Sequence, residues 1–281
     1  MLYLITAILF SSMLSIIMRI SEKYISGNVA MLAANYITCT TVALLDTGAK
    51  NIFTTENGIA TAAFLGIIGG FAYLTSFLLL QYNISKNGVV LPATFMKLGL
   101  LVPTVAAVAV FHEIPTVFQI FGFIIAITAI ILINSDKSEH RKSQKLKIGL
   151  LLGLMLLAGI GDATSKFHEE LGNPKLNDTF LLFIFGTACL LCIVVMIYKK
   201  QRIGKWEILF GAAIGVPNYL SSKFLLLSLN HLPAVVAFPS FCVGCIVVVT
   251  LAGVFLFKEK LSQRQWIALA MIAAALAMLN M

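Results

Sequence analysis

Long apolar runs constrain this chain more than any other feature of its sequence. Ten of them follow one another, each about as long as a helix that crosses a bilayer, with short polar turns between them. Of the 281 residues, 59% are hydrophobic and 11% charged, whereas a soluble domain carries about 25% charged residues. The sequence therefore predicts an all-α integral membrane protein with ten transmembrane helices. The predicted spans are Leu2–Ile20, Gly27–Leu45, Ile59–Tyr82, Val89–Phe111, Thr116–Ile133, Ile148–Gly161, Thr179–Tyr198, Ile208–Leu229, Leu232–Phe257 and Trp266–Met281.

The two halves of the chain resemble each other in order along their length. FLLLQYN at residues 77–83 matches FLLLSLN at residues 224–230, and each half has a G-x-x-x-G motif. The matched pairs are Gly66 and Gly70 with Gly211 and Gly215, Pro92 with Pro239, Glu113 with Glu259, Gln119 with Gln265, and Asn134 with Asn280. Because each half has five spans, the second half enters the membrane from the opposite side, so the repeats are inverted.

The repeats set the predicted domain organisation. Residues 1–134 form the first repeat with spans 1–5, and residues 148–281 form the second with spans 6–10. Residues 135–147 form a basic linker between them. We expect each glycine pair to pack helices closely within one chain, although such motifs also mediate dimerisation.

Basic residues are distributed unevenly between the two sides of the predicted membrane. Loops after the odd-numbered spans hold fifteen Lys and Arg, whereas the other side holds Lys50, Lys166 and Lys175. The positive-inside rule places the odd-numbered loops, including the linker, in the cytoplasm. We expect a multi-pass protein of the cell (inner) membrane, with the lipid bilayer as its surroundings.

The end of each half resembles a known family pattern. Pro103, Glu113, Gln119 and Gly122 match the end of an EamA-type domain of the drug/metabolite transporter superfamily. The second copy keeps Glu259 and Gln265 but has Val249 and Ala268 where Pro and Gly are expected. The resemblance covers essentially the whole chain and implies a ten-helix inverted-repeat transporter of small metabolites, with spans 1–4 and 6–9 around a central cavity. It names no substrate.

Two lysines stand inside otherwise uncharged apolar runs. Lys97 is the single charge of residues 89–111, and Lys223 is that of residues 208–229. A bare ammonium group at the centre of a span costs about 2.5–3.5 kcal/mol, so such residues usually face a wet cavity, a partner or a ligand. Snorkelling to the membrane surface is the alternative. Since no Asp or Glu occupies the middle of a span, we expect a substrate that bears a carboxylate or a phosphate.

Other polar side chains share helix faces with one another or with these lysines. Asn218 and Ser222, and Tyr219 and Lys223, are four residues apart on one helix. Hydrogen bonding between helices is the alternative explanation, at about 0.6 kcal/mol for each bond. The candidate substrate-binding residues are Lys97, Lys223, Asn35, Tyr36, Tyr73, Ser76, Thr94, Asn218, Tyr219 and Ser222.

Two prolines are predicted to interrupt spans. Pro103 should bend span 4, and Pro217 should kink or bulge span 8, because proline removes a helix hydrogen bond. Both are candidate gating or helix-break positions.

Enzyme motifs are incomplete in this sequence. His112-Glu113 lacks the second His of H-E-x-x-H, and residues 159–166 lack the G-K-[ST] ending of a phosphate loop. The two C-x-x-C pairs lie in apolar segments without the turns and polar ligands of a zinc site. We expect no enzyme activity, no cofactor, no metal site and no nucleic-acid partner.

We therefore predict a secondary transporter that moves a small anionic or zwitterionic metabolite by alternating access. A coupling proton is possible, because burial lowers the pKa of a lysine, and the protein is expected to be a monomer or a homodimer. Two alternatives stay open. One is an exporter of cationic drugs or quaternary ammonium compounds that uses an end carboxylate such as Glu22 or Glu169. The other is a membrane scaffold that transports nothing.

Overall fold

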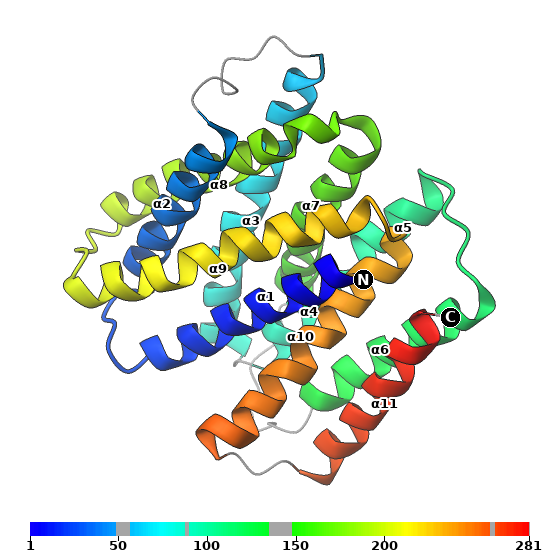
Figure 1. Cartoon of the computed structure of the whole chain (residues 1–281). Coiled ribbons are helices and arrows are strands. Elements are labelled where there is room, and N and C mark those ends of the chain that lie inside the picture. Colours follow the sequence, from blue (N-terminus) through cyan, green and yellow to red (C-terminus); the bar gives the residue numbers. More distant parts are fainter. Residues whose placement is uncertain (49–56, 88–89, 135–147, 259–261, 281) are drawn as a thin grey trace. The chain divides into compact units, whose positions relative to one another are not determined.

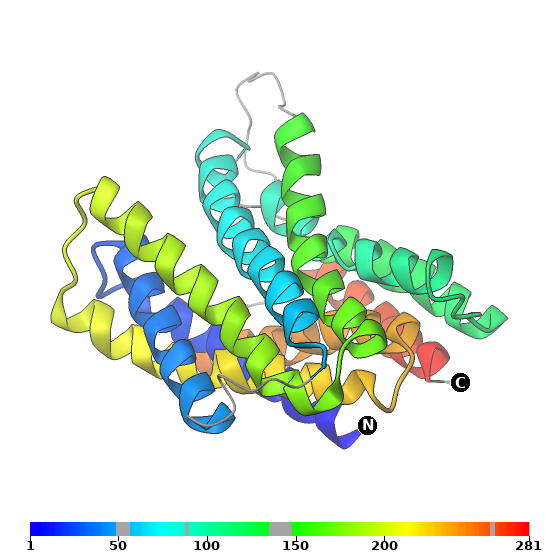
Figure 2. The same cartoon turned by 90° about the horizontal axis from the view of Figure 1, so that it is seen from above.

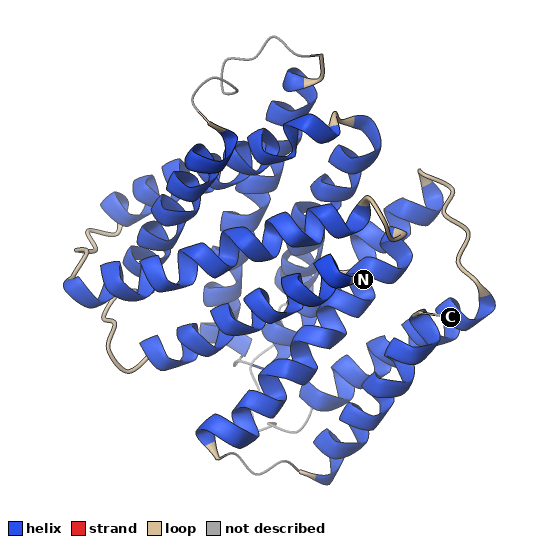
Figure 3. Ribbon diagram, viewed as in Figure 1, coloured by secondary structure: helices blue, strands red, loops and turns tan. Residues whose placement is uncertain are grey.

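The computed structural model describes residues 1–48, 57–87, 90–134, 148–258 and 262–280, and these residues form helices joined by short loops, with no strand among them (Figure 3). The basic linker and Glu259 lie outside the described residues. The described part contains α1 (Leu2–Ser21), α2 (Asn28–Thr47), α3 (Ile59–Asn87), α4 (Val90–Leu98), α5 (Leu101–Ala109), α6 (Val117–Asn134), α7 (Ile148–Leu171), the short 3-10 helix η2 (Pro174–Leu176), α8 (Asn177–Tyr198), α9 (Lys205–Leu229), α10 (Ala234–Phe257) and α11 (Gln263–Leu279).

Most of these helices suit a membrane. By length and composition, six described helices can cross a bilayer, and they are α1, α2, α3, α7, α8 (with η2) and α10. Shorter apolar helices cover residues 95–109, 117–132 and 263–279. α9 belongs to neither group, and its second half carries Asn218, three serines and Lys223. The protein is a multi-pass membrane protein, as the sequence predicts.

The chain divides into two compact units, and each unit takes helices from both halves of the sequence. Unit 1 is Met1–Leu74 with Thr164–His231, and unit 2 is Thr75–Ala163 with Leu232–Met281. Two of the three boundaries fall inside α3 and α7, and the third falls between α9 and α10. The two units therefore do not coincide with the two predicted repeats. The repeat boundaries at residues 134 and 148 stay a prediction.

Unit 1 is held together by close helix packing at glycines. α1 and α2 both pack against α9, and α2 also packs against α8 (Figures 1 and 2). A Cβ atom at Gly66 would lie 2.5 Å from the Cβ of Phe183 on α8, and one at Gly70 would overlap the carbonyl of Ile184. A Cβ at Gly215 would lie 2.5 Å from Thr38 on α2. Both predicted G-x-x-x-G motifs thus pack helices within one chain.

Unit 2 also has a close helix contact at a glycine, between α6 and α11. α6 packs against α11, with a core of Ala126, Ala129, Val243, Ile272 and Ala275. Gly122 permits the close approach, since a Cβ there would lie 3.1 Å from the carbonyl of Ala275.

Matching capping boxes begin α6 and α11, the last helices of the two predicted repeats. The Oε1 atom of Gln119 accepts the Thr116 N–H at 3.0 Å, while the Thr116 hydroxyl accepts the Gln119 N–H at 3.2 Å. Ser262 and Gln265 make the same pair of bonds at 3.0 and 3.3 Å before α11. The matched glutamines therefore satisfy backbone amides at the start of a helix.

The two prolines behave differently from each other. The predicted span 4 is interrupted, because α4 ends at Leu98 and α5 begins at Leu101. Pro103 has no N–H to donate to the Gly99 carbonyl four residues earlier, at the break. α9 is α-helical from Lys205 to Leu229 with Pro217 inside it, so the helix has no bulge there, and the kink that was the other possibility stays a prediction. A membrane helix tolerates one missing hydrogen bond when neighbouring helices support it.

Candidate functional site

A charged cluster within unit 1 joins three helices at one end. Lys223 of α9 forms ion pairs with Asp46 of α2 and with Asp178 of α8, where its Nζ lies 2.9 Å from the Asp178 Oδ1. The Tyr219 hydroxyl, one turn earlier on α9, donates to the Asp46 Oδ2 at 2.8 Å. The lysine side chain is 22% exposed, Asp46 37% and Asp178 33%. We call Asp46, Asp178, Tyr219 and Lys223 the charged cluster.

The position of the cluster follows from how the helices run. Asp46 is next to the last residue of α2, and Asp178 is the second residue of α8. Lys223 lies six residues before the end of α9, or about 9 Å along the axis. Asp178 also lies in the first turn of α8, where the helix dipole stabilises a negative charge. Tyr219 is fully buried against Phe185, with ring centroids 6.0 Å apart.

A row of polar contacts continues from this cluster along α2 and α9. The Asn218 amide donates to the Asn35 Oδ1 at 3.3 Å. The Cys39 thiol, one turn from Asn35, donates to the Gly215 carbonyl at 3.2 Å. The candidate residues Asn35, Asn218, Tyr219 and Lys223 therefore lie along one α2–α9 contact.

These contacts correct one part of the sequence argument. The chain was expected to offer a bare ammonium group at Lys223, with no carboxylate at the middle of a span. Asp46 does lie near a helix end, but Lys223 reaches it and Asp178 as well. The described charges of the cluster sum to one negative charge rather than one positive charge. Lys223 is therefore available to an anion only if one of these pairs opens.

Three other candidate residues lie elsewhere in unit 1. Tyr36 is buried, with Cys39 and Cys192 as its electrostatic neighbours. Tyr73 on α3 and Ser222 on α9 are half-buried. The roles of Tyr36, Tyr73 and Ser222 in substrate binding stay predictions.

The remaining candidates belong to unit 2. Lys97 is exposed near the end of α4, and Asp162, Cys242 and Cys245 act on it electrostatically. Ser76 is buried on α3. The side chain of Thr94 lies outside the described part of the chain. Lys97 and Lys223 thus belong to different units.

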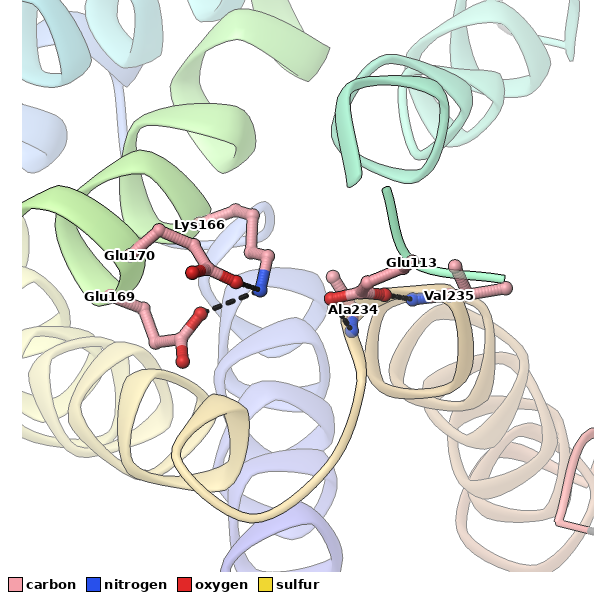
Figure 4. A network of polar contacts seen from close by, with 6 residues as sticks. All are labelled: Glu113, Lys166, Glu169, Glu170, Ala234 and Val235. Atoms are coloured by element: carbon pink, nitrogen blue, oxygen red, sulfur yellow. Dashed lines mark hydrogen bonds and ion pairs between the residues drawn. The ribbon is translucent and has the colours of Figure 1, made fainter. Parts of the chain in front are cut away.

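A second ionic group in unit 1 lies in the last two turns of α7. The Nζ atom of Lys166 lies 2.6 Å from Glu169 and 2.5 Å from Glu170, and its side chain is 3% exposed (Figure 4). His168 beside it stacks on Phe180 with centroids 4.2 Å apart. Its Nε2 lies 3.1 Å from the Asn177 Oδ1. Glu169, proposed above for a cation exporter, therefore shares one ammonium group with Glu170.

Sequence reasoning missed Asp46 and Asp178 as members of the site. One signal was present: both residues stand at helix ends that an inverted five-helix topology places on the side where α9 ends. A hydropathy profile assigns charged residues at helix ends to the loops, so it does not identify them as members of a site within the spans. Only the packing of α9 against α2 and α8 shows that a lysine within a span reaches them.

Comparisons with known proteins agree with this architecture. Residues 145–281 match the EamA-like transporter family. An uncharacterized protein of Haemophilus influenzae is 24% identical over 281 residues, which covers 97% of this chain and 95% of that protein. A solved crystal structure covers 99% of this chain and 94% of its own, with a TM-score of 0.82 and 14% identity, and shows that the fold is shared.

The family match falls on the second predicted repeat, and the relative covers both repeats. Members of the matched family are membrane transporters. Residues 145–281 are therefore similar to the EamA-like transporter family, and nearly the whole chain is similar to the Haemophilus influenzae protein.

Proposed function

We propose that the protein is a secondary active transporter of a small zwitterionic metabolite, one that bears both a carboxylate and an ammonium group. It acts in the cell (inner) membrane by alternating access. The observation that carries this proposal is the charged cluster, in which one ammonium group is held between two carboxylates. The match of residues 145–281 to the EamA-like transporter family supports the transporter class, and the cluster supports the substrate chemistry.

A zwitterion can replace the internal ion pairs with equivalent external ones. Its carboxylate pairs with Lys223, and its ammonium group pairs with Asp46 or Asp178. Such an exchange leaves no charge unpaired in the apolar surroundings, where an unpaired charge is costly. A purely anionic substrate would instead have to compete with both aspartates for one lysine.

The cationic alternative gains support from the same contacts. Two carboxylates that share one ammonium group form a net negative cluster, and a cation could displace Lys223 from either one. The tyrosine hydroxyl on Asp46 would stay in place. A cation transporter should keep its uptake when Lys223 is replaced and lose it when Asp46 or Asp178 is replaced. Mutation therefore distinguishes the two hypotheses.

Uptake into proteoliposomes tests the proposal with three probes: alanine as a zwitterion, succinate as a dianion and tetraphenylphosphonium as a cation. Lys223→Gln, Asp46→Asn and Asp178→Asn are compared with the wild-type protein and with Lys175→Gln, which changes an exposed lysine outside the cluster. Charge-assisted hydrogen bonds contribute about 1.5–3 kcal/mol. Losing one used by the substrate should therefore lower uptake about tenfold or more.

The pattern of losses decides between the readings. For a zwitterion, alanine uptake falls in Lys223→Gln and in at least one aspartate variant, and Lys175→Gln stays at the wild-type rate. If succinate is taken up and only Lys223→Gln loses it, the substrate is an anion. If tetraphenylphosphonium uptake survives Lys223→Gln but not the aspartate variants, the substrate is a cation. Transport of no probe, together with no thermal stabilisation by any metabolite in a screen, would favour a scaffold.

A further inference from the structure

Exposed cations gather at the end of unit 1 opposite the charged cluster. The turn between α1 and α2 carries Lys23, the loop between α8 and α9 carries Lys199, Lys200 and Arg202, and Lys205 begins α9. All five side chains are exposed. Within the part of the chain that the structure describes, no ion pair is found for any of them.

Direct contacts show that this turn and this loop form one surface. The Tyr24 ring lies 5.1 Å from the Trp206 ring and 5.6 Å from the Phe210 ring, measured between centroids. The Ser26 N–H donates to the Glu207 Oε1 at 2.8 Å. Between Lys200 and Arg202, the Gln201 Oε1 accepts the Ala30 N–H at 3.2 Å.

Acidic residues leave most of this charge uncompensated. Glu207 is 5% exposed and is engaged by the backbone of the α1–α2 turn, so it does not meet the cations at the surface. Glu22 is the other acid of the two segments. The surface therefore combines five exposed cations with a half-exposed aromatic cluster, in which Tyr24 is 49% exposed and Trp206 48%.

We propose that this surface binds the phosphate headgroup of an anionic phospholipid, with Tyr24 and Trp206 at the level of the lipid glycerol and the basic side chains around the phosphate. Aromatic rings with a polar edge prefer the membrane–water boundary. A basic residue near an anionic leaflet contributes roughly 1 kcal/mol of attraction, which is about a fivefold change in binding. This surface belongs to the side of the membrane that the positive-inside rule predicts to be cytoplasmic. This site is separate from the charged cluster and does not depend on the substrate.

Fluorescence quenching tests the proposal, because Trp206 and Trp266 are the only tryptophans in the chain. A Trp266→Phe variant is reconstituted in phosphatidylcholine vesicles that contain an equal fraction of brominated phosphatidylglycerol or brominated phosphatidylcholine. We expect Trp206 to be quenched more by the anionic lipid, with a relative association constant at least about fivefold higher. The triple change Lys200→Gln, Arg202→Gln and Lys205→Gln should bring this ratio close to one, and Lys175→Gln should leave it unchanged.

Other results would overturn the proposal. Equal quenching by the two brominated lipids, or a ratio that survives the triple change, would show that no anionic headgroup is selected. Displacement of the anionic lipid by inorganic phosphate would point to a site for a soluble phosphate. Native mass spectrometry of the unsubstituted protein gives an independent readout, in which phosphatidylglycerol adducts should outlast phosphatidylcholine adducts. Adducts of equal persistence would also contradict the proposal.

Discussion

The Nζ atom of Lys223 lies 2.9 Å from the Oδ1 of Asp178 and also pairs with Asp46, so one side chain ties α9 to both α8 and α2. All three groups are partly exposed, and solvent screens their attraction. Each of these ion pairs therefore contributes about 1 kcal/mol or less. Pairs of this strength suit a group that exchanges partners with a substrate.

A double-mutant cycle between Lys223 and Asp178 should reveal their coupling. Lys223→Gln leaves Asp46 and Asp178 facing each other without a cation, so it should destabilise the protein more than Asp178→Asn does. We expect a coupling energy of about 1 kcal/mol, the upper range for a partly exposed pair. Thermal unfolding of the purified protein in detergent measures it, with Lys175→Gln as the control. Strictly additive effects would mean that the pair contributes nothing.

Glu113 should stabilise unit 2 by capping α10. Its two carboxylate oxygens accept the N–H groups of Ala234 and Val235, each at 3.1 Å (Figure 4). Glu113→Ala leaves both amides without this acceptor, and loss of an N-terminal cap costs about 0.5–2 kcal/mol. Detergent-solubilised Glu113→Ala should therefore unfold at a lower temperature than the wild-type protein. Glu22→Ala, at an exposed acid, is the matched control, and equal behaviour of the two variants would refute the capping role.

Enlarging the glycines at helix contacts should be far more damaging than enlarging an open one. Gly70→Ala places a methyl group against the backbone of α8, and Gly215→Ala places one 2.5 Å from Thr38. Each should cost about 1–3 kcal/mol through overpacking. Gly186→Ala is the control, because a Cβ there meets nothing within 4 Å. Yield and thermal unfolding report the effect, and a Gly186→Ala variant as unstable as the other two would contradict the packing account.

Hydropathy predicts the helices well where their surroundings are lipid or an apolar core. The first span was predicted as Leu2–Ile20, and α1 is Leu2–Ser21. The sixth was predicted to end at Gly161, but α7 continues to Leu171. The extra turns carry Lys166, whose charge is neutralised by Glu169 and Glu170. A hydropathy scale treats each residue alone, so it cannot recognise a charge that has a partner within the same helix.

Sequence reasoning missed the charge partners of Lys223 for the same reason. It identified Lys223, Tyr219, Asn218 and Asn35 as polar residues of spans, and the structure places these four along one contact between α2 and α9. It did not identify the charge partners, because the partners lie more than 40 residues away along the chain. The net charge of a site depends on such pairs, so the substrate class could not be deduced from single residues.

Stability should depend on pH through Glu207, which lies just before the predicted span 8. The backbone N–H of Ser26, donating to its carboxylate, holds the pKa of Glu207 below its ordinary value of 4.5. A carboxyl group with a lowered pKa in the folded state contributes stability above its unfolded pKa, and this contribution is lost as the pH falls through the folded value. Glu207→Gln should therefore be less stable than the wild-type protein at pH 7, and the difference should shrink as the pH falls below 4.5. Thermal unfolding from pH 7 to pH 3 measures it, with Glu22→Gln as the control. A difference between Glu207→Gln and the wild-type protein that stays constant across this range would show that the Ser26 contact does not depend on the charge of Glu207.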